Sequence, residues 1–358
     1  MSWTDTLAEP LSTAARPGEW QLIHEAHGGG WLLLPAEPES GNRWHHLAED
    51  SLELRPISPF DDPRLKGLTP TVAHFLGRGD SVELLAWRVG KRAVLRIRGE
   101  DGDRIAKVYR KDRQIFDRWN AFDAESSSAW RTPRVLGWHT RRRCLTVEFC
   151  RGESLNRRWL GGLGVAEDGD RIGELLAWIA ARPLPASLPV HGPEEEISTL
   201  KRRLETFERT LRMPPSRARN LVGAVSAALA STPSTRVLCH RDLHDKQILL
   251  HADGHRLIDL DLASSGPPAL DPANILAHVH LRWLKGAALP WEEIAGRIAE
   301  AAHRDRGVCE SLPVWTASTL LRLALIYSRR RREAGFLERL MDATEAALNA
   351  RGCWRLLG

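Results

Sequence analysis

Strand-like and helical patterning divide the chain into regions of different character. Short runs of β-favouring or alternating residues recur in its first half, at 82–89, 92–98, 104–109, 133–138 and 144–149. A turn at Gly90-Lys91 joins the first two runs as a hairpin. A polar stretch with helical character, about 112–129, follows the third run. This order predicts five antiparallel strands with one helix inserted after the third.

Beyond Gly152 the pattern is mostly helical. Apolar residues return at helical spacing in six segments, 168–181, 197–211, 221–230, 291–302, 315–327 and 336–348. One strand-like interruption, 237–262, divides these segments. Before residue 69, short apolar runs punctuated by Gly and Pro predict a small mixed unit with a few strands. We therefore expect three parts: an extension over 1–68, a strand-rich unit over 69–148 and a helical unit over 149–358.

Composition excludes several classes of protein. The 358 residues are 42% hydrophobic and 27% charged, which predicts a sizeable packed core. No apolar run is long enough to span a membrane, and the first residues lack the basic and apolar parts of a signal peptide. Five scattered cysteines form no C-x-x-C pair, which argues against a zinc site and a disulfide framework. We expect a cytoplasmic protein with no membrane partner.

The net charge of +5 comes with arginine runs at 141–143 and 329–332. A basic excess can indicate nucleic acid or anionic substrates. No aromatic-interleaved basic motif or helix-turn-helix pattern accompanies these runs. An arginine-rich solvated surface is therefore the simpler interpretation, and we expect no nucleic-acid partner.

Candidate chemistry lies in the strand-like interruption. An apolar strand leads into the polar loop His240-Arg241-Asp242-Leu243-His244-Asp245-Lys246-Gln247, and another apolar strand leads out of it. Asp259 and Asp261 follow a turn and a third short apolar run. Carboxylates beside buried strands are costly unless cations or donors meet them. Mg²⁺ with nucleotide phosphates would answer that need, because Mg²⁺ takes few protein carboxylates and keeps phosphate oxygens and waters.

The stretch from Val237 to Asp271 resembles the catalytic region of the protein-kinase-like superfamily, and most closely its aminoglycoside phosphotransferase and choline-kinase group. The resemblance rests on His240-Arg241-Asp242, on the Ile-Asp-Leu-Asp run that ends at Asp261, and on the Gly266 to Asp271 continuation. It implies an α+β, bilobal protein-kinase-like fold, with a five-stranded antiparallel N-lobe containing one helix and a mainly helical C-lobe. It also implies transfer of the γ-phosphate of ATP, or GTP, to a small-molecule hydroxyl with Mg²⁺. Aminoglycoside-like, sugar and amino-alcohol acceptors all stay open.

The resemblance also assigns nucleotide contacts. Lys107 falls on the third strand, at the position of the phosphate-binding lysine of the group. Its partner would be an acid on the following helix, Asp117, Asp123 or Glu125, of which we favour Glu125. The turn carrying Lys91 occupies the place of a glycine-rich loop. The segment that begins Glu148-Phe149-Cys150 resembles the hinge between lobes, where the backbone of Glu148 and Cys150 would bind adenine.

Roles around the transferred phosphate follow from the same resemblance. Asp242 would be the catalytic base. Asp259 would bind the metal, with Gln247 standing where the group has Asn and Asp261 where others have Gly. We interpret Gln247 and Asp261 together as a variant metal site. Two further residues are given structural parts. His240 would pack and orient the loop, and Asp271 would cap a helix and brace the loop.

A nucleotide-binding pseudokinase without transfer activity is the alternative. Gln247 in place of Asn and a nucleotide turn with the single glycine Gly90 motivate it. The expected partners are the same under both hypotheses, a nucleotide and, for the active kinase, a small-molecule acceptor. Acidic residues are not dense in the helical part, which weakens the aminoglycoside interpretation and leaves sugars and neutral metabolites open.

Overall fold

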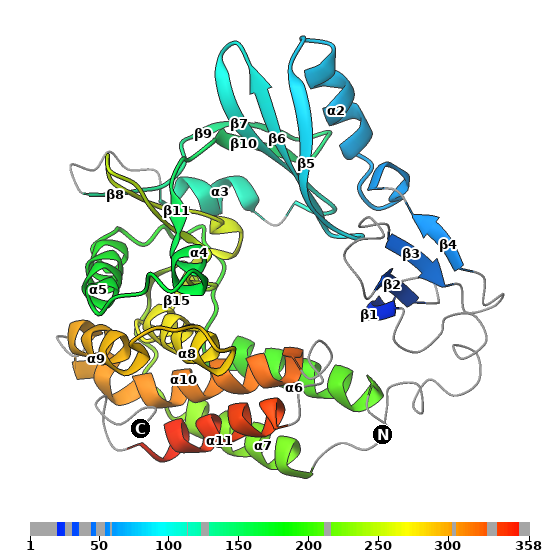
Figure 1. The fold of residues 1–358 in the computed structure, drawn as a ribbon. Coiled ribbons are helices and arrows are strands. Elements are labelled where there is room, and N and C mark those ends of the chain that lie inside the picture. Colours follow the sequence, from blue (N-terminus) through cyan, green and yellow to red (C-terminus); the bar gives the residue numbers. More distant parts are fainter. Residues whose placement is uncertain are drawn as a thin grey trace.

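The computed structural model describes residues 20–25, 31–35, 44–47, 54–57, 59–112, 114–122, 129–210, 216–302, 306–327 and 335–350. Figure 1 shows strands in the first part of the chain and mostly helices after them. The helices are α2 (Leu68–Leu76), α3 (Ile115–Asn120), α4 (Leu155–Leu160), α5 (Glu167–Ala180), α6 (Pro193–Thr210), α7 (Ser216–Ala230), α8 (Leu270–Leu284), α9 (Trp291–Ala302), α10 (Arg306–Tyr327) and α11 (Phe336–Asn349), with the short 3-10 helices η3 (Pro59–Asp61) and η4 (Leu260–Leu262).

The strands form four separate sheets. They are β1 (Trp20–Glu25), β2 (Trp31–Pro35), β3 (Trp44–Leu47), β4 (Leu54–Ile57), β5 (Ser81–Arg88), β6 (Arg92–Gly99), β7 (Gly102–Tyr109), β8 (Trp130–Arg131), β9 (Val135–His139), β10 (Cys144–Glu148), β11 (Glu153–Ser154), β12 (Val237–Cys239), β13 (Ile248–Leu250), β14 (His255–Leu257) and β15 (Ser264–Gly266). Strands β1–β4 pair in sequence order, which confirms the few strands expected within 1–68.

The five-stranded sheet confirms the predicted antiparallel unit. Its order is β5-β6-β7-β10-β9, and α3 follows its third strand. Alternation along β6 buries Ala93, Leu95 and Ile97 in one core with Leu68 and Phe75 of α2. The opposite face of β6 and β7 is therefore free to present polar side chains to the rest of the molecule.

Register decides which side chains share that polar face. Arg92 pairs with Tyr109, and Val94 pairs with Lys107. Residues opposite each other in an antiparallel pair point to the same face. Ala106 and Val108, the alternate residues of β7, pack into the core under α2. Arg92, Lys107 and Tyr109 consequently all point away from α2.

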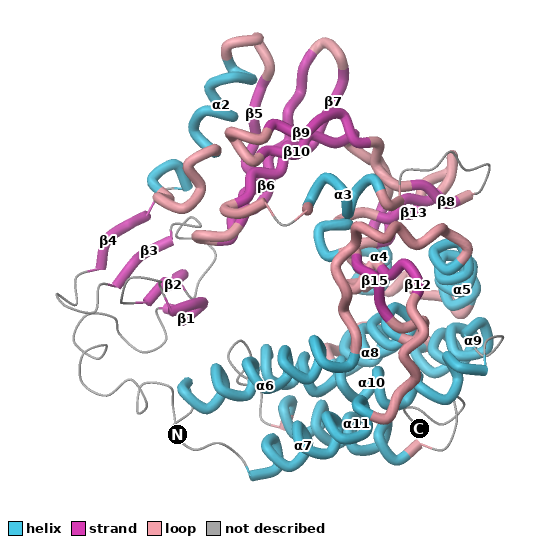
Figure 2. The backbone as a smooth tube through the Cα atoms, turned by 180° about the vertical axis from the view of Figure 1, so that it is seen from behind, coloured by secondary structure: helices cyan, strands magenta, loops and turns pink. Residues whose placement is uncertain are grey.

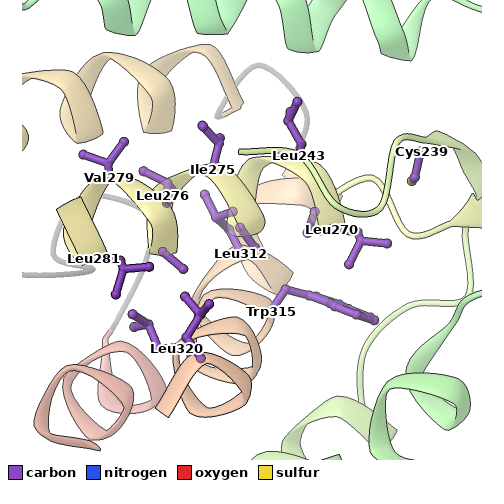
Figure 3. Close-up of a cluster of buried hydrophobic side chains, with 14 of the residues drawn as sticks. Cys239, Leu243, Leu270, Ile275, Leu276, Val279, Leu281, Leu312, Trp315 and Leu320 are labelled. Carbon is purple, nitrogen blue, oxygen red and sulfur yellow. The ribbon is translucent and has the colours of Figure 1, made fainter. Parts of the chain in front are cut away.

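The helical part is built around α8 and α10, whose apolar side chains interdigitate (Figure 3). Trp315 and Leu320 of α10 belong to the same buried cluster as Leu270 and Leu281 of α8 and lie on their side of that helix. Leu243 of the polar loop is fully buried in the same core, so the loop is anchored to the helical bundle. Seen from behind, α6, α7 and α11 lie beside this pair at the far end of the molecule from the five-stranded sheet (Figure 2). Among the described residues, no helix is both long and apolar enough to cross a bilayer.

The structure corrects several element boundaries. Within the described part of the helix predicted over about 112–129, α3 is followed by a turn at 121–122, and Trp130, just beyond the predicted end, pairs with His255 of β14. α10 starts well before the predicted residue 315, since it is buried on most sides and has no apolar stripe that marks its beginning. α2 and α4 had no counterpart in the prediction. The other predicted helices agree with α5, α6, α7, α9 and α11 within a few residues at each end.

Candidate active site

The polar loop between β12 and β13 is held in a strained backbone conformation. Arg241 has φ of +72°, in the left-handed region that non-glycine residues rarely adopt. Asp271 of α8 accepts the N–H groups of His240 and Arg241, both at 2.7 Å. Asn274, one turn further along α8, donates to the carbonyl oxygen of Arg241 at 2.6 Å. Both sides of the strained residue are thus fixed by α8, which stabilises the conformation.

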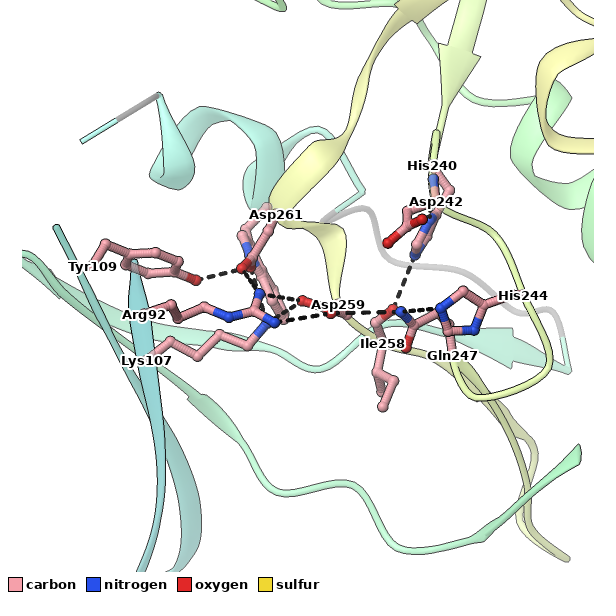
Figure 4. Close-up of polar contacts among 11 residues, drawn as sticks. Arg92, Lys107, Tyr109, His240, Asp242, His244, Gln247, Ile258, Asp259 and Asp261 are labelled. Atoms are coloured by element: carbon pink, nitrogen blue, oxygen red, sulfur yellow. Dashed lines mark hydrogen bonds and ion pairs between the residues drawn. The ribbon is translucent and has the colours of Figure 1, made fainter. Parts of the chain in front are cut away.

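His240 orients the residue after Arg241. Its Nε2 donates to the carbonyl oxygen of Ile258 at 3.0 Å, which leaves Nδ1 to accept the N–H of Asp242 at 3.3 Å. The ring is fully buried. These contacts agree with the packing and orienting part given to His240. Within the described chain, no hydrogen bond or ion pair occupies the carboxylate of Asp242, whose side chain is shown in Figure 4.

A second buried carboxylate ties the loop to the helices. Asp245 is fully buried, and Arg282 of α8 donates to both of its oxygens at 2.6 and 3.0 Å. Asn156 of α4 adds a third donor at 2.6 Å. A bidentate arginine and an amide satisfy this charge, which would otherwise be costly to bury. The loop therefore reaches α4 as well as α8.

Asp259 and Asp261 meet two cations from the five-stranded sheet (Figure 4). Lys107 Nζ lies 2.5 Å from Asp259 Oδ1 and 2.9 Å from Asp261 Oδ1. Arg92 Nη1 lies 3.0 Å from Asp259 Oδ1 and also contacts Asp261 Oδ2. This ionic cluster links strands β6 and β7 to the segment that follows β14. It forms because the strand register points Arg92 and Lys107 to one face.

Asp261 has two further donors. Tyr109 Oη donates to Asp261 Oδ1 at 2.8 Å, and Trp119 Nε1 of α3 donates to the same oxygen at 3.0 Å. Burial and the neighbouring carboxylate raise the pKa of Tyr109 well above its usual value, so the phenol keeps its proton as a donor. Lys107 Nζ also lies 4.8 Å from the centre of the Trp119 ring, a cation–π contact. Sequence analysis found neither aromatic residue, although Tyr109 stands two positions from Lys107 and therefore shares its face.

The cations decide the ionisation of Asp259. Burial alone would raise its pKa, but Lys107 and Arg92 hold the pKa well below its usual range. Asp259 is therefore a carboxylate at neutral pH. Its Oδ1 is occupied by the two cations, while contacts to Oδ2 from Arg92 and Gln247 are long, at 3.5 Å each.

Gln247 ends beside Oδ2 of Asp259. Its amide nitrogen, Nε2, lies 3.2 Å from His244 Nε2 and 3.5 Å from Asp259 Oδ2. The N–H of Lys246 donates to His244 Nδ1 at 3.2 Å. Burial lowers the pKa of His244, so the ring is neutral. The amide nitrogen of Gln247 thus lies between the neutral His244 ring and the carboxylate of Asp259.

The Gln247 amide and Oδ2 of Asp259 face the same space, and an amide turned by half a rotation would present its oxygen there. In the described part of the chain, no three His, Cys, Asp or Glu side chains converge as a metal site would need. A small donor set of this kind suits Mg²⁺, which is commonly bound through one or two carboxylates together with substrate phosphates. The donor chemistry therefore fits the metal that the resemblance implies.

The turn that carries Lys91 is fixed by a residue the sequence analysis did not single out. Asp62 is buried and accepts the N–H of Gly90 at 2.6 Å and the indole N–H of Trp87 at 3.1 Å. Gly90 has φ of +63°, which glycine adopts without strain. The carbonyl oxygen of Lys91 accepts the N–H of Arg110 at 3.0 Å. The turn is therefore held rigidly at the end of the sheet.

The expected hinge leaves part of its backbone available. The N–H of Glu148 donates to the carbonyl oxygen of Arg134 at 2.9 Å. Among described residues, no backbone hydrogen bond uses the N–H or the carbonyl oxygen of Cys150. Burial raises the pKa of the Cys150 thiol to about 11, so it is protonated. A ligand could use the peptide of Cys150, whereas the N–H of Glu148 is already taken.

Of the three acids predicted as partners of Lys107, only Asp117 lies among the described residues. Asp117 is exposed on α3, whereas the buried side chains of α3 are those of Ile115, Arg118 and Trp119. Asp123 and the favoured Glu125 lie outside the described residues. Within those residues, the acids that contact Lys107 are Asp259 and Asp261.

Proteins of known structure share this architecture. No curated protein matches the chain by sequence. Its fold resembles that of a thermostable mutant of aminoglycoside phosphotransferase APH(4)-Ia in a ternary complex with ADP and hygromycin B. The TM-score is 0.58, with 14% identity over 78% of this chain and 100% of that one.

Two other solved structures give similar values. A choline/ethanolamine kinase family protein from Mesorhizobium loti has a TM-score of 0.54 and 15% identity, over 84% of this chain and 98% of that one. Amicoumacin kinase hAmiN, in complex with AMP-PNP, Ca²⁺ and Ami, has a TM-score of 0.53 and 15% identity, over 76% and 89%. These likenesses confirm the bilobal kinase-like fold.

Sequence comparison with family models gives the assignment itself. The model described as the phosphotransferase enzyme family matches residues 81–312, which is more than half of the chain. That range contains the five-stranded sheet, the braced loop and the ionic cluster. The chain therefore belongs to the phosphotransferase enzyme family, whose members are small-molecule kinases acting on hydroxyl groups.

Proposed function

We propose that the protein transfers the γ-phosphate of ATP to a hydroxyl group of a small molecule with Mg²⁺, using Asp242 as the catalytic base. The observation that carries this proposal is the carboxylate of Asp242. It stands on a loop fixed by His240 and Asp271, yet no described residue occupies it. A general base must be held in place and still be open to the proton it accepts.

The nucleotide would lie between the five-stranded sheet and the loop. Lys107 and Lys91 are the cations we assign to its phosphates, and the peptide of Cys150 with the carbonyl oxygen of Glu148 is assigned to adenine. Nucleotide complexes of proteins with this fold, with ADP and with AMP-PNP, support a nucleotide site here.

Asp259 and Gln247 would hold the metal. Oδ2 of Asp259 and the Gln247 amide face the same space, where a rotated amide would present its oxygen to a cation. The bound ion would neutralise negative charge on the phosphates. The residues of the chain do the remaining work: Asp242 orients the acceptor hydroxyl and takes its proton, and Lys107 stabilises charge on the phosphate oxygens.

Asp242→Asn provides the first test. We expect kcat for ADP release with an acceptor to fall by about 10²- to 10⁴-fold, because the amide cannot take a proton. The affinity for a non-hydrolysable ATP analogue should stay within about threefold, since Asp242 is not assigned to the nucleotide. Screening aminoglycoside, sugar and amino-alcohol hydroxyls in a coupled ADP assay would supply the acceptor. Asp253→Asn, at a turn carboxylate that is 84% exposed, is the matched control.

The pseudokinase alternative has one specific observation in its favour. Arg92 and Lys107 both engage Asp259, so cations already occupy one of its oxygens. If the protein binds the analogue but forms no ADP with any hydroxyl compound, and Asp242→Asn changes nothing, the pseudokinase is correct. Acceptor-dependent ADP formation that Asp242→Asn abolishes would rule it out.

A further inference from the structure

We propose that Asp261 is the acid that positions Lys107, and that it is not a ligand of the metal. The inference rests on the proposed function, because it assigns parts within the same site. It departs from the sequence-based hypothesis that grouped Asp261 with Gln247 and Asp259 as metal ligands. Its basis is the occupancy of the Asp261 oxygens.

Both oxygens of Asp261 are engaged by protein donors. Its Oδ1 accepts from Lys107 at 2.9 Å, from Tyr109 at 2.8 Å and from Trp119 at 3.0 Å. Arg92 contacts Oδ2. Four donors thus meet one carboxylate, and a further cation could approach only Oδ2, which the Arg92 guanidinium already engages. Asp261 is also 8% exposed, which leaves little access from the cleft.

Asp259 differs on each of these counts. Its side chain is 24% exposed, and its Oδ2 has only contacts of 3.5 Å. That oxygen lies beside the Gln247 amide, whereas the described residues that donate to Asp261 are Arg92, Lys107, Tyr109 and Trp119. Beyond the shared Lys107 and Arg92, the two carboxylates therefore face different partners. Asp259 is open to a cation, and Asp261 is enclosed by the sheet and α3.

Helix α3 explains how Asp261 comes to hold Lys107. Its inner face brings donors rather than a carboxylate: Trp119 reaches Asp261, and Arg118 donates to the carbonyl oxygen of Ala263 at 2.6 Å. Its one acid, Asp117, is exposed. α3 thus fixes the segment 261–263, and Asp261 in turn fixes Lys107. Among the described residues, the acid that reaches the lysine comes from the segment after β14 and not from α3.

Asp261 and Asp259 both contact Lys107, but the two carboxylates have different tasks. An ammonium group has three protons to donate. Asp261 engages one of them and Asp259 another, so one remains for a nucleotide phosphate. If a metal draws Asp259 away, Lys107 keeps its contact with Asp261 and stays in position. Asp261 is therefore a positioning residue and Asp259 is the carboxylate available to the cation.

Isosteric amides at the two aspartates test this division by binding alone. We would titrate a non-hydrolysable ATP analogue in EDTA by calorimetry, and then titrate Mn²⁺ into the analogue complex with detection by electron paramagnetic resonance. Asp261→Asn should weaken metal-free analogue binding about tenfold or more, because a charged hydrogen bond to Lys107 is lost, while the Mn²⁺ Kd stays within about threefold. Asp259→Asn should show the opposite pattern: unchanged or tighter metal-free binding and Mn²⁺ affinity lowered at least about tenfold.

Tyr109→Phe and Trp119→Phe keep the proposal testable if Asp261→Asn does not fold. Each removes one donor to Asp261 and leaves Asp259 untouched, so each should weaken the metal-free analogue complex and leave the Mn²⁺ Kd unchanged. Loss of Mn²⁺ affinity in Asp261→Asn, or in both aromatic variants, comparable to that in Asp259→Asn would overturn the proposal. These readouts need no turnover. A protein that transfers no phosphate could still show the crossed pattern, and an active one could lack it.

Discussion

Glu196 shows how a single buried charge connects distant parts of the protein. It lies on α6, is fully buried, and contacts His191 at 2.9 Å and Ser318 at 2.7 Å. Arg322 of α10 lies 3.3 Å from Glu196 and donates to Asn274 at 2.7 Å. Asn274 holds the carbonyl oxygen of Arg241. A chain of polar contacts therefore connects α6 to the polar loop between β12 and β13.

Acid should weaken the fold through Glu196. Burial would raise its pKa, but Arg322 and His191 hold the pKa at about 2. A lowered carboxyl pKa contributes stability that is complete above about pH 4.5 and is lost as pH falls toward 2. The shift corresponds to about 3 kcal/mol. Burial also lowers the pKa of His191, so protonation of His191 acts in the same direction below its usual pKa of 6.5.

Urea unfolding between pH 7 and pH 3 would measure this contribution. The unfolding free energy of the wild type should decline steeply below pH 4.5. Glu196→Gln should be less stable at pH 7, because Arg322 loses its partner, and its decline in acid should be shallower by most of that 3 kcal/mol. Parallel pH profiles for the two proteins would contradict the assignment. Glu194→Gln, in the same helical turn, is the comparison variant.

Helix α8 determines the backbone conformation of the polar loop between β12 and β13. Asp271 and Asn274 fix the backbone around Arg241, and Arg282 neutralises Asp245. The prediction that Asp271 braces the loop is confirmed by its contacts. The prediction that it caps its own helix is wrong, because its oxygens accept the N–H groups of His240 and Arg241 and α8 has no side-chain cap. Rigid support of this kind holds a base in the geometry its chemistry needs.

Removing that brace should affect stability and catalysis together. Asp271→Ala leaves two buried N–H groups unpaired, so we expect a loss of about 2–4 kcal/mol in unfolding free energy and at least a tenfold loss in kcat. Adding Arg241→Gly should restore about 1 kcal/mol, because glycine adopts φ of +72° without strain. Denaturant unfolding of the single and double variants measures both effects. Equal stability of the two would show that the strain at Arg241 is not supported by Asp271.

The sequence-based predictions were correct where the signal lies in neighbouring residues. They failed where a contact between residues far apart in the sequence determines the structure. The strands around Lys107 were predictable because alternation and turn residues are properties of neighbouring positions. The loop was recognisable because His240, Asp242 and Gln247 are close in sequence. Trp119 was not found, since its partner Asp261 is 142 residues away. The length of α3 was overestimated for the same reason, because the pairing of Trp130 with His255 is a tertiary contact.

At the scale of the whole molecule, the ionic cluster joins the two parts of the fold. Arg92 and Lys107 belong to the five-stranded sheet, while Asp259 and Asp261 belong to the segment packed on the helical part, as Figures 1 and 4 show. The cluster lies where the nucleotide is proposed to bind. Ligand binding should therefore strengthen the connection between the two parts as well as fill a site.

Nucleotide binding should accordingly raise the thermal stability of the full chain. At a concentration 100 times Kd, the ATP analogue with Mg²⁺ should add about 2.7 kcal/mol, which differential scanning calorimetry would detect as an increase of several degrees in Tm. Lys107→Ala should largely abolish the increase, whereas Lys201→Ala, an exposed position on α6, should retain it. An undiminished Tm increase in Lys107→Ala would contradict the part given to this lysine.

The pairing of β6 with β7 has a consequence for how this protein can change in length. Arg92, Lys107 and Tyr109 reach the site because the register between β6 and β7 has no shift. It runs from Gly99 opposite Gly102 to Arg92 opposite Tyr109. One residue inserted in β6 after Arg92 would turn Arg92 beneath α2, and one inserted in β7 before Lys107 would turn Lys107 and Tyr109 there. Either insertion would bring alanine or valine side chains to face the carboxylates. Insertions between Gly99 and Gly102 leave that alternation intact. The hairpin tip is therefore the place where tags, labels or natural insertions are tolerated, whereas a single added codon a few positions away would inactivate the enzyme.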